Sequence, residues 1–248
     1  RGVGTFGNNN PMVLIDGVEG SIAQISDIPS ADIESISVLK DAASAAIYGV
    51  RAANGVILIT TKRGKASDKL NVSYAGSYTL QTPGTVPDFI DSYNWALMRN
   101  EVRPDTFNEE ALQKLKDGSD PDRYANTDWL DQVLRNAHMH QHHLSINGGS
   151  ENVRYMASVS YSNQEGIMKE TGVERISFRS NLDTNYKRFN FGLNISGTKN
   201  DVEAPAVAPS GEGGIMRYVS WFTRPTVPVM YSNGHYGYVD GSMTNAED

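Results

Sequence analysis

The feature that most restricts the fold of this sequence is an alternation of apolar and polar side chains that recurs between residues 70 and 196. In the first such segment Leu70, Val72 and Tyr74 alternate with Asn71 and Ser73. Because successive side chains of a β-strand point to opposite faces, this period predicts strands with one apolar and one polar face. The pattern returns at 144–146, 153–161, 176–182 and 189–195, which gives about five strands.

Both a soluble β-sandwich and a membrane β-barrel contain such strands. Charged and amide side chains such as Arg175, Arg179 and Asn181 crowd the polar faces, which suits the wet or plugged interior of a barrel. The links comprise two tight turns, 148–152 and 184–187, and three longer loops, 82–138, 163–174 and 198–248. Short turns at one end and long loops at the other are typical of outer-membrane barrels. We therefore expect residues 67–248 to form the N-terminal part of a transmembrane antiparallel β-barrel with long extracellular loops.

The composition excludes several other classes of protein. A formal net charge of −7 disfavours sequence-independent binding of nucleic acid, which needs a positive surface against phosphate. The chain has no cysteine, so disulfide frameworks and thiolate chemistry are absent. No apolar stretch approaches the roughly 20 residues of a transmembrane helix. No Ser/His/Asp or paired-carboxylate arrangement stands in a catalytic context, so we do not expect an enzyme.

Residues 1–66 predict a small mixed α/β domain. After a loop rich in glycine and asparagine, apolar or alternating runs predict strands at 11–15, 34–39 and 56–61. The last of these is β-branched and typical of a central strand.

Local signals place turns and helices between these strands. Asp16-Gly17 predicts a turn, and Ser30 is a candidate cap for a short helical turn. Asp41 is a candidate N-cap for an alanine-rich helix at 42–47, which Gly49 ends.

The segments 32–49 and 51–62, with Gly64 and the upstream 11–17, closely resemble the plug domain of SusC/RagA-type TonB-dependent transporters. Asp128-Trp129, 143–150 and 178–182 are similar to the start of the barrel in the same family. The residues that carry the plug resemblance are Asp32, Glu34, Lys40, Asp41, Tyr48, Gly49, Arg51, Asn54 and Gly55.

The resemblance implies an α+β plug domain at residues 1–66, held inside a barrel of about 22 strands. It also implies a multi-pass outer-membrane protein of Bacteroidota that contacts outer-membrane lipid. Such proteins import oligosaccharides or peptides, powered by the TonB–ExbB–ExbD complex, and a SusD-like surface lipoprotein closes over them. About five strands cannot close a barrel without unpaired edges, so we expect this chain to be part of a longer one.

Two other functions fit the sequence. The first is a ligand-sensing outer-membrane receptor of the same architecture. The second is a soluble β-rich glycan-binding module. Arg51 is a candidate electrostatic lock between plug and barrel; the alternative is a surface arginine.

The loop at 82–138 is long enough to hold structure of its own. Periodicity predicts helices at 92–101 and 108–116, the second capped by Asn108, and a third at 215–222 in a later loop. Candidate contacts to substrate or lid in these loops are Trp95, Trp129, Tyr124, Tyr218 and Trp221. Aromatic rings stack on sugar faces, although the same residues also serve to pack loop helices.

We expect neither a metal nor another cofactor. His138, His140 and His142 share one face of a strand, which allows a metal site but is more typical of solvated histidines at a barrel rim. The oxygen-rich stretch 117–122 allows a loop calcium, but lacks the twelve-residue pattern and its terminal glutamate.

Overall fold

The computed structural model describes residues 10–40, 46–49, 52, 54–205, 214, 216–217, 219 and 223–237. The chain divides into two compact units. The first combines residues 1–79, 138–164 and 172–202, and the second combines 80–137, 165–171 and 203–248. We call the part of the first unit before residue 67 the plug and its five long strands the wall. The second unit is the loop unit.

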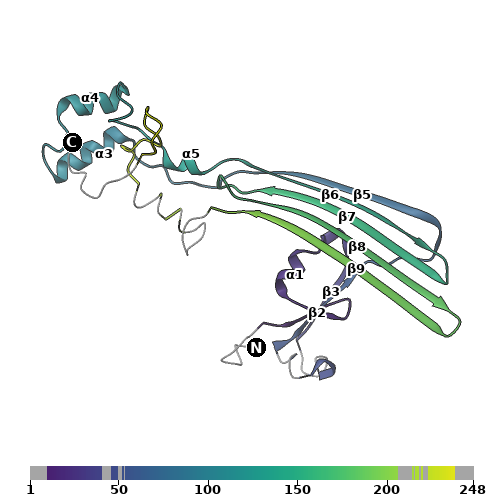
Figure 1. Ribbon diagram of the computed structural model, residues 1–248. Coiled ribbons are helices and arrows are strands. Elements are labelled where there is room, and N and C mark those ends of the chain that lie inside the picture. The colour runs from purple at the N-terminus through teal and green to yellow at the C-terminus, as the bar shows by residue number, and fades with distance from the viewer. Residues whose placement is uncertain are drawn as a thin grey trace. The chain divides into compact units, whose positions relative to one another are not determined.

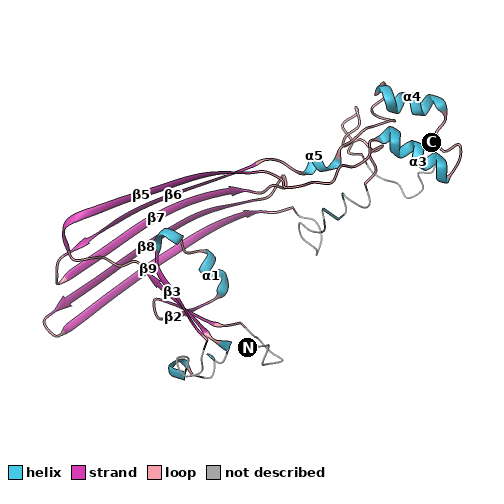
Figure 2. Cartoon of the chain, turned by 180° about the vertical axis from the view of Figure 1, so that it is seen from behind, coloured by secondary structure: helices cyan, strands magenta, loops and turns pink. Residues whose placement is uncertain are grey.

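The plug is built on a four-stranded mixed sheet (Figures 1 and 2). Its strands are β1 (Met12–Ile15), β2 (Val18–Gly20), β3 (Ile33–Leu39) and β4 (Val56–Thr61), in the order β2-β1-β4-β3. β4 pairs parallel with β1 and antiparallel with β3. The three predicted strands, and the central place of the β-branched one, are therefore confirmed.

The Asp16-Gly17 turn joins β1 to β2 as a two-residue hairpin loop. Both residues have positive φ, +51° and +85°, as the tight turns that match the twist of a hairpin require. Leu14, Ala52 and Val56 form the buried core on one side of the sheet.

The helices of the plug differ from the prediction. A capping box between Ser21 and Gln24 starts helix α1 (Ile22–Ser26), which the sequence reading missed although its S-x-x-Q signal is present. Ser30 is not a cap: it is the first residue of the 3-10 turn η1 (Ser30–Asp32), which follows Pro29 without a side-chain cap. Asp41 and most of the predicted alanine-rich helix lie outside the described residues, and its end forms the 3-10 turn η2 (Ala46–Tyr48).

The wall is a five-stranded sheet in which sequence neighbours are spatial neighbours, so the predicted five strands are confirmed. They are β5 (Ser67–Gln81), β6 (Ala137–Gly149), β7 (Val153–Glu165), β8 (Gly172–Tyr186) and β9 (Phe189–Glu203). The strands run further than the alternation indicated. The turn predicted at 184–187 is really at Lys187, where φ is +54°, and the link predicted at 163–174 shrinks to 166–171.

The loop unit contains α3 (Ser92–Val102), α4 (Glu109–Asp117) and α5 (Trp129–Val133). The first two confirm the predicted helices, and Asn108 caps α4 by accepting a hydrogen bond from the Ala111 N–H. α3 and α4 pack through a buried cluster of Ala96, Ala111, Leu115 and Tyr124. The helix predicted at 215–222 falls mostly outside the described residues. No helix in the described part of the chain has the length and apolar character needed to cross a bilayer.

Candidate functional site at the contact between plug and wall

Polar side chains on alternate residues of the wall strands form the surface that contacts the plug. On β8 these are Arg175, Arg179, Asn181 and Asp183, each of which bonds to a plug residue. The residues between them face the other way, as the period of a strand requires. On β8 the polar face predicted from the sequence is thus a surface that contacts the plug.

Asp32 makes the most buried of these contacts. It ends η1 and is only 2% exposed. One carboxylate oxygen lies 2.8 Å from Nε2 of His143 on β6, and the other accepts a 2.8 Å hydrogen bond from the hydroxyl of Ser158 on β7. Its backbone carbonyl also accepts the Lys62 N–H at 2.8 Å. A buried carboxylate is tolerated only with such partners, so this residue ties the plug to two wall strands at once.

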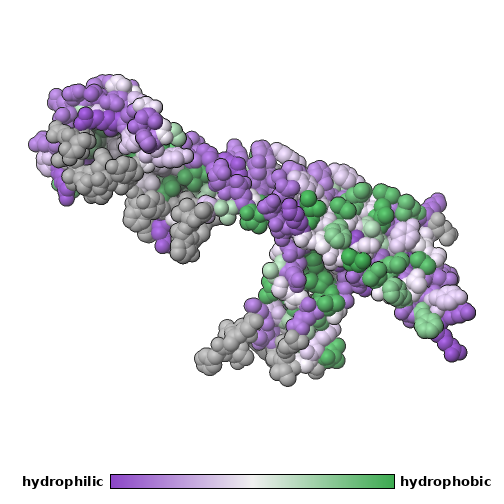
Figure 3. All heavy atoms as spheres, in the orientation of Figure 1, coloured by the Kyte–Doolittle hydropathy of each residue, from purple (hydrophilic) through white to green (hydrophobic). Residues whose placement is uncertain are grey.

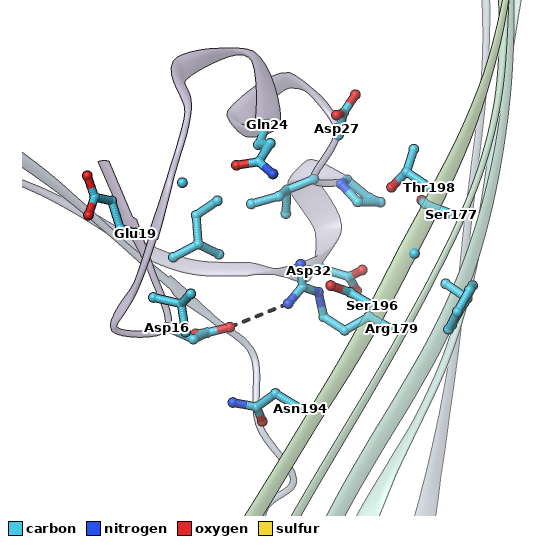
Figure 4. A pocket seen from close by; sticks show the side chains of 17 residues that line it. Asp16, Glu19, Gln24, Asp27, Asp32, Ser177, Arg179, Asn194, Ser196 and Thr198 are labelled. Carbon is cyan, nitrogen blue, oxygen red and sulfur yellow. Dashed lines mark hydrogen bonds and ion pairs between the residues drawn. The ribbon is translucent and has the colours of Figure 1, made fainter. Parts of the chain in front are cut away.

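Asp16 forms a second buried contact. Its carboxylate accepts bonds from the backbone N–H and the hydroxyl of Thr61, at 2.9 and 2.7 Å, within the plug. It also pairs with Nη1 of Arg179 on β8 at 3.4 Å, and the two side chains are 6% and 10% exposed. Figure 4 shows this pair at the edge of a crevice of about 440 Å³ between the β1–β2 hairpin, α1 and strands β8 and β9.

The C-terminal end of α1 makes a third, more exposed contact. Arg175 donates from Nη1 to the Ser26 carbonyl at 2.5 Å and lies 3.7 Å from the Asp27 carboxylate. A cation at this end also complements the helix dipole. Asn200 on β9 donates to the same carboxylate at 3.0 Å.

The segment that joins the plug to β5 runs along the wall. Asn181 donates to the Lys62 carbonyl at 2.9 Å, and Arg63 pairs with Asp183 at 2.9 Å. Gly64 is buried directly against the backbone of Tyr155 on β7, where a side chain has no room. This is a close approach that requires glycine.

Among the described residues that carry the plug resemblance, Asp32 touches the wall. Glu34, Lys40 and Asn54 are exposed, and Tyr48 packs against the plug core. Gly49 and Gly55 adopt positive φ, +76° and +94°, which favours glycine. Asp41 and Arg51 lie outside the described residues, so the electrostatic lock proposed for Arg51 stays a prediction.

The alternating pattern placed Arg179 and Asn181 on the polar face of a strand but did not predict which wall residues contact the plug. His143, Ser158, Arg179 and Asn181 are spread over three strands, and each is an ordinary member of an alternating run. The available signal was the concentration of charged and amide groups on one face of β8.

The predicted loop aromatics have different surroundings. Trp95 and Trp129 line a pocket of about 450 Å³ with Phe89, Asp91 and Asp128. The Trp129 indole N–H donates to the Arg224 carbonyl at 2.9 Å, and Trp95 makes an edge contact with Phe107. Tyr124 is 9% exposed in the loop core, which favours packing over ligand contact for this residue. Tyr218 and Trp221 lie outside the described residues.

The stretch considered for calcium is a set of local turns. Asp117 accepts the Ser119 N–H at 2.9 Å, and hydrogen bonds from Ser119 hold the pKa of Asp117 below its usual value. Asp122 accepts bonds from Ser232. Among the described residues no group of three or more histidine and carboxylate side chains is arranged to hold a metal ion.

The outward face of the wall is apolar and exposed. Figure 3 shows green side chains gathered over the region of β5–β9. They include Leu70, Val72, Leu144, Val159, Ile176, Phe178, Phe191, Leu193 and Ile195, all between 41% and 58% exposed. An apolar surface of this extent is unusual for a protein in water and marks a membrane or partner interface.

Comparison with known proteins explains why one face of the wall is polar and the other apolar. Residues 1–56 match the family model of the TonB-dependent receptor plug domain. The chain is 32% identical over 249 residues to the TonB-dependent receptor SusC of Bacteroides thetaiotaomicron, covering 96% of this chain and 23% of SusC. It is 38% identical over 239 residues to the TonB-dependent receptor P26 of Formosa agariphila, covering 94% and 23%.

Solved structures agree with these relatives. The RagAB peptide importer in its closed-closed state matches 97% of this chain and 30% of its own, with a TM-score of 0.70 and 26% identity. The RagAB peptide transporter matches 82% and 26%, with a TM-score of 0.67 and 30% identity. The chain belongs to the SusC/RagA type of TonB-dependent receptors. It spans 23% of the length of the two curated relatives.

As part of a SusC/RagA-type receptor, the wall is a segment of an outer-membrane β-barrel. Its exposed apolar face is the lipid-facing surface, and the plug covers its polar face. The contacts of Asp32, Asp16 and Arg175 are therefore contacts between a plug and the inside of a barrel.

Proposed function

We propose that the receptor containing this chain imports an oligosaccharide or a peptide across the outer membrane by displacing its plug. In this proposal residues 1–66 are the plug and the barrel starts at residue 67. The TonB–ExbB–ExbD complex supplies the force and a SusD-like surface lipoprotein forms the lid. The loop unit faces the outside, where the pocket of Trp95 and Trp129 receives the substrate or the lid.

The polar character of the contact between plug and wall is the observation that carries this proposal. Asp32, Asp16 and Asp27 hold the plug through hydrogen bonds and ion pairs, which act only over short distances. A displacement of a few ångströms breaks such contacts and lets water take over the freed groups. An apolar interface would instead expose large surfaces to water and resist separation.

A crosslink across this contact tests the proposal, and this chain has no native cysteine that could compete with the introduced pair. The pair Asp27→Cys and Asn200→Cys replaces an exposed 3.0 Å hydrogen bond between α1 and β9. We expect the oxidised receptor to lose uptake of a labelled oligosaccharide or peptide, and a reductant to restore it. Uptake must also stop when TonB is depleted.

A matched control is the pair Arg63→Cys and Asp183→Cys, which lies where the plug joins the wall. This end stays in place when the rest of the plug moves, so its crosslink should leave uptake intact. Normal uptake by the oxidised Asp27–Asn200 pair would contradict plug displacement.

A further inference from the structure

A group of histidines and tyrosines stands on the lipid-facing side of the wall. His142 Nδ1 lies 2.7 Å from the Tyr74 hydroxyl, and His138 Nδ1 is hydrogen-bonded to the Tyr78 hydroxyl. The His140 ring lies 5.7 Å from the His142 ring and 5.6 Å from the Tyr161 ring. We call these six residues of β5, β6 and β7 the His–Tyr cluster.

The cluster marks the edge of the apolar band. His142 is opposite Tyr161 in the register of β6 and β7, and His140 is opposite Asn163. The outward residues of β7 are apolar up to Tyr161 and polar from Asn163 onward. His140 and His142 therefore stand where hydrocarbon gives way to lipid headgroups.

The hydrogen bond between Tyr74 and Nδ1 of His142 leaves the other ring nitrogen of His142 to bond with the membrane. When the Tyr74 hydroxyl donates to Nδ1 of His142, the neutral ring carries its hydrogen on Nε2. A headgroup phosphate provides strong hydrogen-bond acceptors for such a donor.

A glycine keeps the cluster compact. Gly76 lies between Tyr74 and Tyr78 on β5, and a side chain added there would come within 2.8 Å of the Tyr74 hydroxyl. Glycine weakens a strand unless something packs close to it.

We propose that His140 and His142, oriented by Tyr74 and flanked by Tyr161, bind the phosphate of a phosphorylated glycolipid in the outer leaflet. The choice of the outer leaflet rests on the proposed function, in which the loop unit faces the outside. The three histidines lie at the start of β6, which directly follows the first segment of the loop unit in the chain. The lipid would brace β5, β6 and β7 from outside. Neither transport nor plug contact requires it.

The test uses the whole receptor, purified from outer membranes and delipidated in mild detergent. Native mass spectrometry counts bound lipid A in its phosphorylated and dephosphorylated forms. The variant His140→Asn/His142→Asn keeps a group for Tyr74 to bond but removes both imidazole rings. The matched control is His235→Asn in the loop unit. Losing a charge-assisted hydrogen bond should weaken binding about tenfold or more.

We expect the wild type and His235→Asn to retain phosphorylated lipid A, and the double variant to lose it while uptake is preserved. Equal retention by the double variant, or equal retention of the dephosphorylated lipid, would overturn the proposal. Displacement by inorganic phosphate alone would overturn it too, because the site would then select phosphate rather than lipid. If the double variant does not fold, shown by its gel mobility before and after heating, Tyr74→Phe serves instead and should weaken binding without abolishing it. Absence of TonB-dependent uptake in the wild-type receptor, with selective lipid binding intact, would count against the proposed function alone.

Discussion

The two faces of the wall have opposite polarity, although they alternate residue by residue along the same strands. Ser158 and Arg179 face the plug and are 4% and 9% exposed, whereas their neighbours Val159 and Phe178 face outward and are 54% and 51% exposed. In a protein dissolved in water the buried face would be the apolar one. The difference shows that the surroundings of this sheet are inverted, with lipid outside and a polar domain inside.

This inversion means that the two faces depend on different forces. On the inner face each buried polar group needs its partner, and removing one partner leaves the other without its hydrogen bond. On the outer face the apolar side chains need only an apolar solvent, so truncations there are mild and charges are costly. Substitutions on each face should reveal which force operates.

The largest effect is expected on the inner face, at Asp32. Asp32→Ala removes the acceptor of His143 and Ser158 and leaves both without this partner in a buried contact. Leaving a buried hydrogen-bonding group without its partner costs on the order of 1–3 kcal/mol, and two groups lose their partner here. We expect the plug to loosen, with faster proteolysis of the plug in the purified receptor and easier entry of a large antibiotic into cells.

Glu34→Ala is the matched control, because it removes an exposed carboxylate two residues further along the same segment. It should leave both the rate of plug proteolysis and the entry of the antibiotic at the wild-type level. An Asp32→Ala receptor whose plug resists protease as well as the wild type would show that the apolar plug core, not this contact, holds the plug.

The next effect tests the outer face through two consecutive residues of β9. Leu193→Arg places a charge in the apolar band, whereas Asn194→Arg places the same charge on the inner face beside the crevice. A basic residue at the bilayer midplane costs about 2–4 kcal/mol. The fraction of receptor that resists unfolding by heat in detergent and lipid should fall for the first variant only. Equal losses would mean that Leu193 does not face hydrocarbon.

The repeating features of the molecule were predictable from the sequence, and the contacts were not. Alternation gives the strands of the wall because its period is a local property, and a β-branched run gives the central strand β4. Asp32 is separated from its partners His143 and Ser158 by more than 100 residues, so no local pattern connects it to either of them.

The errors of the sequence reading have local physical causes. Helix α1 is only five residues long and buries no side chain, so it shows no apolar periodicity, and only its capping box marks it. The turn predicted at 184–187 begins only at its last residue, Lys187, because polar residues such as Thr184 and Asn185 end an alternating run without ending the strand. In the loop unit, Tyr124 looks like a surface aromatic until α3 and α4 are seen to enclose it.

A smaller effect is expected where the two regions touch most closely. At Gly64→Ala the new methyl group meets the Tyr155 backbone, which belongs to β7 and cannot move aside easily. Overpacking of this kind costs about 1–3 kcal/mol. Gly84→Ala is the control, since nothing lies within 4 Å of a side chain there. Thermal unfolding should shift for Gly64→Ala alone; an unshifted midpoint would mean that plug and wall are packed more loosely at this point.

The smallest effect concerns the loop unit, which supplies an ion pair in ordinary water to compare with the buried contact of Asp32. Glu110 and Lys114 pair at 2.9 Å one turn apart on α4, where the Glu110 side chain is 74% exposed and that of Lys114 is 33% exposed. The hydrogen bond and charge of Lys114 lower the pKa of Glu110 below its ordinary 4.5, so the contribution to α4 is present above that pH. It is lost as the pH falls through the lowered pKa in the folded protein. Hydrogen exchange of residues 109–117 should therefore quicken slightly below pH 4.5 in the wild type, relative to Glu110→Gln.

An exposed pair is screened by water and contributes little, whereas Asp32 is shielded and its partners have no substitute. If Glu110→Gln loosened the receptor as much as Asp32→Ala, burial would not be what separates the two contacts.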